Sequence, residues 1–365
     1  MTYLDYQATT PLAPEALDAM LPWLRDGHAN PHSAHREGRR AKAAVEVARE
    51  RVESFGPAVA GALAFTSGAT EALNWAIKGT DGPIVTLASE HAAVLDTVAA
   101  EARRGRSVTV VPVGADGLVD LEAAAAAIRP GTGLVAAMLV NNEIGVVQPI
   151  AALGDLAHAA GALMLCDAVQ GWGRIHVPAD CDLVACSAHK IYGPKGIGAL
   201  WIRDGVSLTP LMHGGGQETG GRSGTLSPAL CAGFGAAAWQ MIDRQFDDGR
   251  LISRLWKVAL ETLGPDWIVN GSVEHRYPGN LNVRLPGLDV SRLMSEVRDV
   301  AFSAGSACAS GSGRSSHVLR AIGLSEAEAR SSIRLGFGRY TTEGELVEAV
   351  SRIDAAARAQ RRVAA

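Results

Sequence analysis

Short apolar runs alternate with longer amphipathic stretches along the first two-thirds of the chain. Apolar runs predict buried strands, and stretches with apolar residues at every third or fourth position predict helices. Strands are expected at residues 62–65, 83–88, 107–113, 133–140, 162–166, 183–186 and 198–202. Helices are expected at residues 14–26, 36–55, 72–78, from 92, 121–128 and 150–160. This alternating order predicts an α/β layer with a mostly parallel sheet.

The pattern changes after residue 202. A glycine-rich loop at residues 213–225 is followed by an alanine-rich helical stretch, 229–244, and a second helical stretch, 250–263, which lead out of the first layer. Beyond them strands are expected at 281–285 and 332–337, and helices at 290–297, 318–322 and from 344. This mixture of short elements predicts a second, smaller α+β domain.

Composition excludes several classes of protein. The 365 residues are 47% hydrophobic and 20% charged, with a net charge of −4, so nothing indicates nucleic-acid or anionic-membrane binding. No apolar run reaches membrane-spanning length, and residues 1–6 lack the features of a signal peptide, so a cytoplasmic protein is expected. The five cysteines lack CxxC spacing, so neither a disulfide framework nor a metal site is expected.

Polar side chains that could bind a ligand or take part in catalysis follow directly after the predicted strands. In parallel sheets, binding sites form at the carboxyl ends of the strands. The residues placed there are Thr70, His91, Asn142, Asp167, Gln170 and Lys190. Their shared position predicts one site at this edge of the sheet.

Lys190 lies in the stretch Ser187-Ala188-His189-Lys190, between two apolar strands. Burial favours the neutral amine of lysine, which is the form that makes Schiff bases. Serine, histidine and loop N–H groups beside it can hold a phosphate. These features point to pyridoxal phosphate (PLP) on Lys190. The alternative is an ordinary exposed lysine in a strand–loop–strand connection.

A second anion site is predicted where the strand at 62–65 runs through residues 66–71 into a helix, because helix N-termini attract anions. Alternatively, Thr66, Ser67 and Thr70 merely cap this helix. Asp167 either pairs with a protonated pyridine nitrogen or is a surface or capping aspartate.

Alternatives also remain open for the residues expected around the pyridine ring of the cofactor. His91 lies either against the ring face or in an ordinary loop. Asn142 and Gln170 are either donors to the ring oxygen or turn residues.

Cys308 lies in a loop of glycine, serine and alanine, unlike Cys166 and Cys186, which lie in apolar strands. A thiol on such a loop is accessible and can reach a neighbouring site. We therefore interpret Cys308 as a reactive thiol.

Together these stretches resemble the cysteine desulfurase family (NifS/IscS-like), within the class V aminotransferase group of fold-type I PLP enzymes. The similar motifs run in order from the first residues to near the last: 4–11, 30–35, 66–71, 90–91, 140–145, 167–170, 189–196, 213–225, 305–308 and 333–342. The resemblance implies a large PLP-binding domain of residues 12–245. It also implies a small domain of residues 1–11 and 246–365 that carries the cysteine loop.

The resemblance also implies the cofactor contacts. Lys190 is expected to form the Schiff base, Asp167 to pair with the pyridine nitrogen, Gln170 to bond the phenolic oxygen and His91 to stack on the ring. The phosphate is expected to be held by Ala69, Thr70, Ser187 and His189. Thr225 is expected to reach the phosphate of the other subunit, which implies a homodimer with shared active sites.

For the substrate, the resemblance implies that Arg334 and Asn142 bind the carboxylate of L-cysteine, with Asn142 also beside the cofactor. Lys190 would remove the Cα proton, and the Cys308 thiolate would attack the substrate sulfur, leaving alanine and a persulfide. The sulfur would pass to an acceptor such as an iron–sulfur scaffold protein, or to tRNA thiolation or another thio-cofactor. Two alternatives remain: another class V lyase acting on selenocysteine or a thioether, and a non-catalytic sulfur-trafficking protein.

Several positions depart from the family pattern. Ala188 stands where glycine is usual, Thr219 where arginine is usual and Gly336 where serine is usual. The chain also ends soon after its last predicted helix, without the longer tail that helps to dock the scaffold. These departures leave the chemistry intact and bear on the identity of the acceptor.

Overall fold

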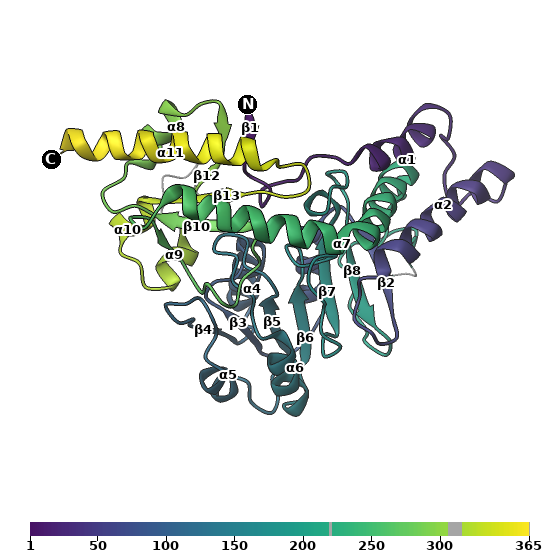
Figure 1. Ribbon diagram of the computed structural model, residues 1–365. Coiled ribbons are helices and arrows are strands. Elements are labelled where there is room, and N and C mark those ends of the chain that lie inside the picture. Colours follow the sequence, from purple (N-terminus) through teal and green to yellow (C-terminus); the bar gives the residue numbers. More distant parts are fainter. Residues whose placement is uncertain (219–220, 306–315, 365) are drawn as a thin grey trace.

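The computed structural model describes residues 1–218, 221–305 and 316–364, with side chains up to residue 360. Its centre is a seven-stranded sheet in the order β2-β8-β7-β6-β5-β3-β4 (Figure 1). The strands are β2 (Gly61–Thr66), β3 (Ile84–Leu87), β4 (Val108–Val111), β5 (Leu134–Met138), β6 (Leu163–Asp167), β7 (Leu183–Ser187) and β8 (Gly198–Arg203). Only β8 runs antiparallel to its neighbours, so the prediction of a mostly parallel α/β sheet is confirmed.

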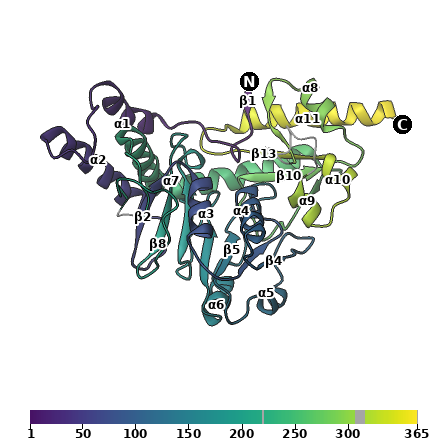
Figure 2. The ribbon, with the colours of Figure 1, turned by 180° about the vertical axis from the view of Figure 1, so that it is seen from behind.

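Helices cover both faces of this sheet, and the strands supply apolar side chains to each face in turn. Leu134 and Ala136 of β5 pack with α3 (Ala69–Lys78) and α4 (Ala92–Arg103), which Figure 2 shows on the near face. The intervening Val135 and Ala137 join the cluster on the other face. That face is covered by α1 (Pro14–Arg25), α2 (Arg36–Glu53), α6 (Ile150–Ala159) and α7 (Pro228–Leu263), while α5 (Leu121–Ala127) follows β4. Burial on both faces explains why the inner strands β3, β5, β6 and β7 read as continuous apolar runs.

Helix α7 corrects one sequence-based expectation. The two helices predicted at 229–244 and 250–263 are one helix of 36 residues, Pro228–Leu263. The polar stretch between them does not break it, because Asp248 is buried and pairs with Arg339 at 2.7 Å. Since α7 passes without interruption through residue 245, the expected division of the chain there stays a prediction.

The C-terminal part forms a smaller α+β unit, as expected. Its four-stranded antiparallel sheet has the order β12-β13-β10-β9. These strands are β9 (Ile268–Val269), β10 (Asn280–Arg284), β12 (Ser303–Ala304) and β13 (Ser332–Gly336), with helices α8 (Val290–Glu296), α9 (His317–Ala321), α10 (Glu326–Arg330) and α11 (Glu343–Ala364). The N-terminal strand β1 (Thr2–Tyr3) pairs here with β11 (Val300–Ala301), so the start of the chain lies beside its last third.

The elements that the sequence pattern missed are all short. Strands β1, β9, β11 and β12 have two residues each, and α10 has five. Periodicity cannot reveal elements of this length. Among the described residues, no helix is both long and apolar enough to cross a membrane.

Asp182 fixes the edge of the sheet opposite to the polar strand ends. Its buried carboxylate accepts hydrogen bonds from the Met164 amide and His158 Nε2, both at 2.8 Å, and forms an ion pair with Arg203. We expect Asp182→Ala to lower the free energy of unfolding by about 2–3 kcal/mol, since it leaves a buried N–H without a partner. Urea denaturation followed by circular dichroism measures this loss.

The control is Arg254→Ala, which removes an exposed ion pair with Glu343. Pairs of this kind contribute about 0–1 kcal/mol, so this variant should be nearly as stable as the wild type. Equal stability of the two variants would contradict the role given to Asp182.

Candidate active site

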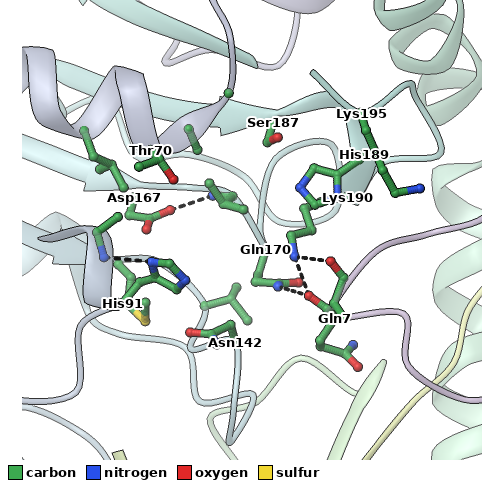
Figure 3. Close-up of a pocket in the computed structure, with 18 of the residues that line it drawn as sticks. Gln7, Thr70, His91, Asn142, Asp167, Gln170, Ser187, His189, Lys190 and Lys195 are labelled. Carbon is green, nitrogen blue, oxygen red and sulfur yellow. Dashed lines mark hydrogen bonds between the residues drawn. The ribbon is translucent and has the colours of Figure 1, made fainter. Parts of the chain in front are cut away.

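A cavity of about 450 Å³ lies at the carboxyl ends of the central strands (Figure 3). Most of the residues expected from the sequence line it, although they come from distant parts of the chain. Those that do are Ala69, Thr70, His91, Asn142, Asp167, Gln170, Ser187, His189, Lys190 and Arg334. The fold therefore gathers ten predicted site residues around one space, while their individual roles stay predictions.

One end of the cavity is the N-terminus of α3. Its N-cap is Gly68, and no side chain caps it, so the alternative that Thr66, Ser67 and Thr70 merely cap this helix does not hold. A Cβ atom added at Gly68 would have no neighbour within 4 Å. A Cβ atom added at Gly198 would lie only 2.7 Å from the Gly68 backbone. The glycine at 198 lets β8 approach the turn closely. The uncapped N–H groups and the helix dipole make this end suitable for an anion.

Lys190 lies in a single 3-10 turn, Ala188–Lys190, directly after β7. Its Nζ donates hydrogen bonds to the backbone oxygens of Gln7 at 2.5 Å and Ala8 at 2.8 Å. The N-terminal segment thus folds over the end of the sheet and supplies acceptors to the amine. Lys190 is half-buried within the cavity rather than exposed on a connecting loop.

Asp167, the last residue of β6, carries a carboxylate that is only 5% exposed. Burial raises its pKa, while the charges of His91 and Lys190 oppose that shift. Its Oδ1 accepts a hydrogen bond from the Val169 amide at 3.0 Å. A buried carboxylate at this position can pair with a protonated ring nitrogen.

His91 is the N-cap of α4, and its Nδ1 accepts a hydrogen bond from the Ala93 amide at 3.0 Å. Burial lowers the pKa of His91, and Asp167 opposes the shift. Because Nδ1 accepts, the proton of the neutral ring lies on Nε2. The cap therefore fixes both the tautomer and the place of the ring in the cavity wall.

Two buried amide oxygens at the cavity have no hydrogen-bond partner among the described residues: Asn142 Oδ1 and Gln170 Oε1. The Nε2 of Gln170 donates to the backbone oxygen of Gln7 at 2.9 Å, which holds that side chain at the cavity. Unsatisfied buried acceptors are costly, so these oxygens fit a ligand that donates hydrogen bonds.

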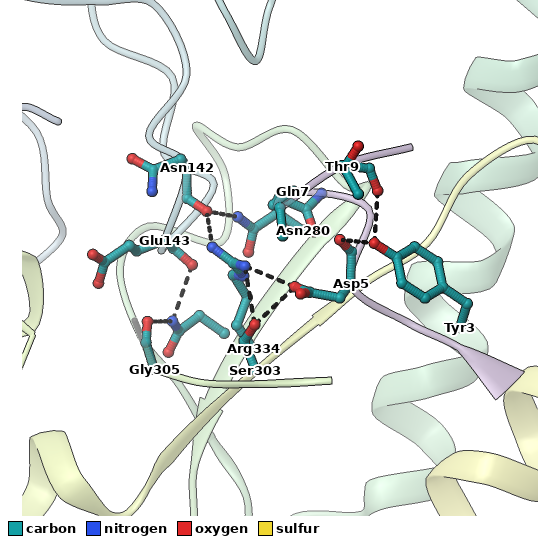
Figure 4. Close-up of polar contacts among 12 residues, drawn as sticks. Tyr3, Asp5, Gln7, Thr9, Asn142, Glu143, Asn280, Ser303, Gly305 and Arg334 are labelled. Atoms are coloured by element: carbon teal, nitrogen blue, oxygen red, sulfur yellow. Dashed lines mark hydrogen bonds and ion pairs between the residues drawn. The ribbon is translucent and has the colours of Figure 1, made fainter. Parts of the chain in front are cut away.

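Arg334 reaches the cavity from β13 and is 1% exposed (Figure 4). Its guanidinium donates to the Asn142 backbone oxygen at 2.9 Å and to the Asp5 carboxylate at 2.7 Å. The Nε atom has no hydrogen-bond partner in the described part of the chain. A buried cation at the edge of the cavity suits a carboxylate ligand.

The structure also shows site residues that sequence reasoning missed. Gln7, Ala8 and Lys195 line the cavity, and Asp5 orients Arg334. Asp5 lies in the N-terminal motif at residues 4–11, but the similarity of that motif does not reveal that Asp5 pairs with Arg334.

Two predicted residues lie elsewhere. Thr225 is exposed and does not line this cavity, so its expected contact with a partner's cofactor stays a prediction. Cys308 lies outside the described residues. The four described cysteines, Cys166, Cys181, Cys186 and Cys231, are buried free thiols. In the part of the chain that the structure describes, no group of three or more His, Cys, Asp or Glu side chains is arranged to hold a metal ion.

Comparison with known proteins places the chain in a family. The family model for class-V aminotransferases matches residues 2–349. Cysteine desulfurase IscS of Rickettsia bellii is 42% identical over 96% of this chain and 90% of its own length. The mitochondrial cysteine desulfurase of Saccharomyces cerevisiae is 44% identical over 96% of this chain and 74% of its own length. This chain belongs to the cysteine desulfurase group of the class-V aminotransferases.

Solved structures of the cysteine desulfurase group and similar proteins share the fold. A NifS-like protein superposes with a TM-score of 0.88 at 32% identity, covering 97% of this chain and 98% of the other. A structure of SspA in complex with cysteine has a TM-score of 0.83 at 36% identity, covering 94% and 100%. The resemblance inferred from the sequence motifs and the expected fold-type I architecture are both confirmed.

His189 should stay neutral at physiological pH. Burial and the charges of Lys190 and Lys195 lower its pKa to about 4. The unfolded chain then binds more protons than the folded one, so stability should fall as the pH decreases from about 6.5 to about 4. We expect the His189 imidazole NMR resonance to show no titration between pH 8 and about 5.5.

The control for this titration is Lys195→Ala, which should raise the pKa of His189 by removing a nearby positive charge. His189→Asn identifies the resonance. A His189 signal that titrates at the ordinary value near 6.5 would contradict this electrostatic picture.

Proposed function

We propose that this protein is a PLP-dependent cysteine desulfurase that converts L-cysteine to L-alanine and transfers the sulfur to Cys308 as a persulfide. The reaction balances as L-cysteine plus the Cys308 thiol giving L-alanine plus the Cys308 persulfide. The observation that carries the proposal is the meeting of Lys190, Asp167 and Arg334 around one cavity. Membership of the cysteine desulfurase group supports the same reaction.

The residues of the cavity fit PLP. The uncapped N-terminus of α3, with Ala69 and Thr70, would face Ser187 and His189 around the phosphate. The buried Asp167 would pair with the ring nitrogen, and the unsatisfied Gln170 Oε1 offers an acceptor for a ring hydroxyl. When bound, PLP supplies a conjugated ring that takes up the charge left when the substrate Cα proton is removed.

Arg334 and Asn142 would bind and orient the substrate. The Arg334 guanidinium, held by Asp5 and the Asn142 carbonyl, is positioned to attract the carboxylate of an amino acid. The free Asn142 Oδ1 can accept a hydrogen bond from the substrate ammonium. These contacts select a free α-amino acid over a peptide.

Lys190 would move the Cα proton. Its amine lies in the cavity beside the Gln7 and Ala8 carbonyls, which accept hydrogen bonds from it. Because burial lowers the pKa of His91, its imidazole adds no positive charge beside Lys190 at neutral pH. The proton removed from Cα is available for return to the product carbon.

The Cys308 thiolate would attack the substrate sulfur, forming an S–S bond as the Cβ–S bond breaks and the electron pair stays on carbon. We propose that the persulfide then passes to an acceptor protein, such as an iron–sulfur scaffold, or to a thio-cofactor or tRNA thiolation pathway. We also propose a homodimer in which Thr225 completes the partner's site, and a cytoplasmic location.

The test compares purified wild-type protein with Cys308→Ala on L-cysteine. We expect the wild type to form alanine and a persulfide on Cys308. The variant should keep the cofactor absorbance and lose sulfur transfer, because it lacks the accepting thiol. Alanine is measured by chromatography and the persulfide by mass spectrometry.

A wild-type protein without bound cofactor would favour a non-catalytic sulfur-trafficking role. A Cys308→Ala variant as active as the wild type would instead indicate a lyase without a sulfur-carrying thiol. Either result would contradict the desulfurase proposal.

Arg334→Lys should raise the KM for L-cysteine by about 10- to 100-fold, since charge-assisted hydrogen bonds contribute about 1.5–3 kcal/mol. Steady-state kinetics measures this change. The matched control is Arg339→Lys, which alters a similarly buried arginine paired with Asp248 outside the cavity. Equal KM values in the two variants would contradict the role of Arg334.

A further inference from the structure

Glu143 lies beside Gly305 and Ser316, the two described residues that flank the segment 306–315. The segment itself, which contains Cys308, lies outside the described residues, but its flanking residues Gly305 and Ser316 are described. Glu143 follows Asn142, which lines the cavity, and is 3% exposed. No role in the reaction above requires a buried carboxylate at this place.

The first flank is tied to the backbone of Glu143. Asn282 Nδ2 donates to the Glu143 backbone oxygen at 3.0 Å and to the Gly305 backbone oxygen at 3.4 Å. The Gly305 amide donates to the Ser332 backbone oxygen at 2.8 Å. Figure 4 shows Glu143 and Gly305 on either side of this bridge. One amide therefore holds Gly305 beside the turn that carries Asn142.

The second flank is tied to the side chain of Glu143. Ser316 Oγ accepts a hydrogen bond from the Leu319 amide at 3.0 Å and contacts Glu143 Oε2. A hydroxyl has one proton, so the Ser316 hydroxyl donates it to the Glu143 carboxylate. The next residue, His317, donates from Nε2 to the Glu90 backbone oxygen at 2.8 Å, immediately before His91.

An apolar cluster supports this second attachment. Ile144 and Val146, which follow Glu143, pack with Val318, Leu319 and Ile322 of the α9 region, and all five are buried. Helix α9 thus cannot shift away from the Asn142 turn without breaking this cluster. Polar ties and packing together fix Ser316 relative to the cavity wall.

We propose that Glu143 is a positioning residue for sulfur transfer: its backbone and carboxylate hold Gly305 and Ser316, which flank the segment containing Cys308, beside the turn that carries Asn142. The proposal rests on the proposed desulfurase function. It extends that function from the residues of the cavity to the attachment that lets the thiol meet the bound substrate. Small errors in such placement cost large factors in rate.

The experiment uses two variants that cut the same tie from opposite sides, Glu143→Ala and Ser316→Ala. In single-turnover mixing of the PLP-loaded protein with L-cysteine, persulfide formation on Cys308 should slow by about 10- to 100-fold. Binding of L-cysteine, followed by its spectral change, should stay at the wild-type level because Arg334 and Asn142 are retained. Glu143→Gln should restore much of the rate, since its amide oxygen can accept the Ser316 hydroxyl proton.

The matched control is Ser325→Ala. Ser325 is the N-cap of α10, a helix of five residues like α9, and its side chain bonds only with Glu328 among the described contacts. This variant loses a cap of the same kind without touching Glu143. If it slows sulfur transfer as much as Ser316→Ala, the effect is one of general stability and the proposal fails.

A second readout does not depend on turnover. Alkylation of Cys308 by iodoacetamide, without substrate, should be faster in Ser316→Ala than in the wild type or Ser325→Ala, because one end of the segment is released. Unchanged alkylation, or wild-type transfer rates in Ser316→Ala, would overturn the role of Glu143. If the wild type itself forms no persulfide, the proposed function fails, and the alkylation comparison still decides whether Glu143 holds the segment.

Discussion

The buried guanidinium of Arg334 joins three parts of the chain that are far apart in sequence. It binds Asp5 of the N-terminal segment, the Asn142 carbonyl at the end of the large sheet and Ser303 of the small sheet. A buried charge is costly unless its donors find partners, so these parts must come together for the cation to be accommodated. Their meeting at Arg334 holds the N-terminal segment over the strand ends, where it forms part of the cavity wall.

Charge in the cavity is balanced between neighbouring groups. Lys190 rests on backbone oxygens of the same N-terminal segment that Asp5 anchors, while Asp167 faces it from β6. The pKa values of His91 and His189 are both lowered by burial, so neither ring adds a further positive charge at neutral pH. The cavity thus has the amines of Lys190 and Lys195, the Asp167 carboxylate and the Arg334 guanidinium in its wall, a set that would suit the proposed chemistry of an amino acid on a phosphorylated ring.

The sequence predicts the central sheet well because its strands are buried on both faces and read as apolar runs. The ends of those runs also reveal Asp167 and Lys190, since polar residues follow directly. Asp5 and Gln7 could not be assigned in this way, because their partners Arg334 and Gly279 are more than 270 residues away and no local pattern records such contacts. The helix break predicted between residues 244 and 250 is wrong for a similar reason: the pairing of Asp248 with Arg339 satisfies a polar group that local patterning assigns to a loop.

A residue with a strained backbone, Tyr192, lies two positions after Lys190. Tyr192 has a φ of 67°, a conformation that costs a bulky residue about 1–3 kcal/mol. Its ring is 1% exposed, its hydroxyl accepts from the Arg339 amide at 2.9 Å, and the Arg339 guanidinium stacks 4.4 Å above it. Burial of one aromatic ring contributes enough to offset that strain. The left-handed residue turns the chain sharply two residues after Lys190, and the packing of Tyr192 stabilises this turn. Helix α7, which supplies Asp248 to Arg339, is thereby linked to Tyr192 through two contacts.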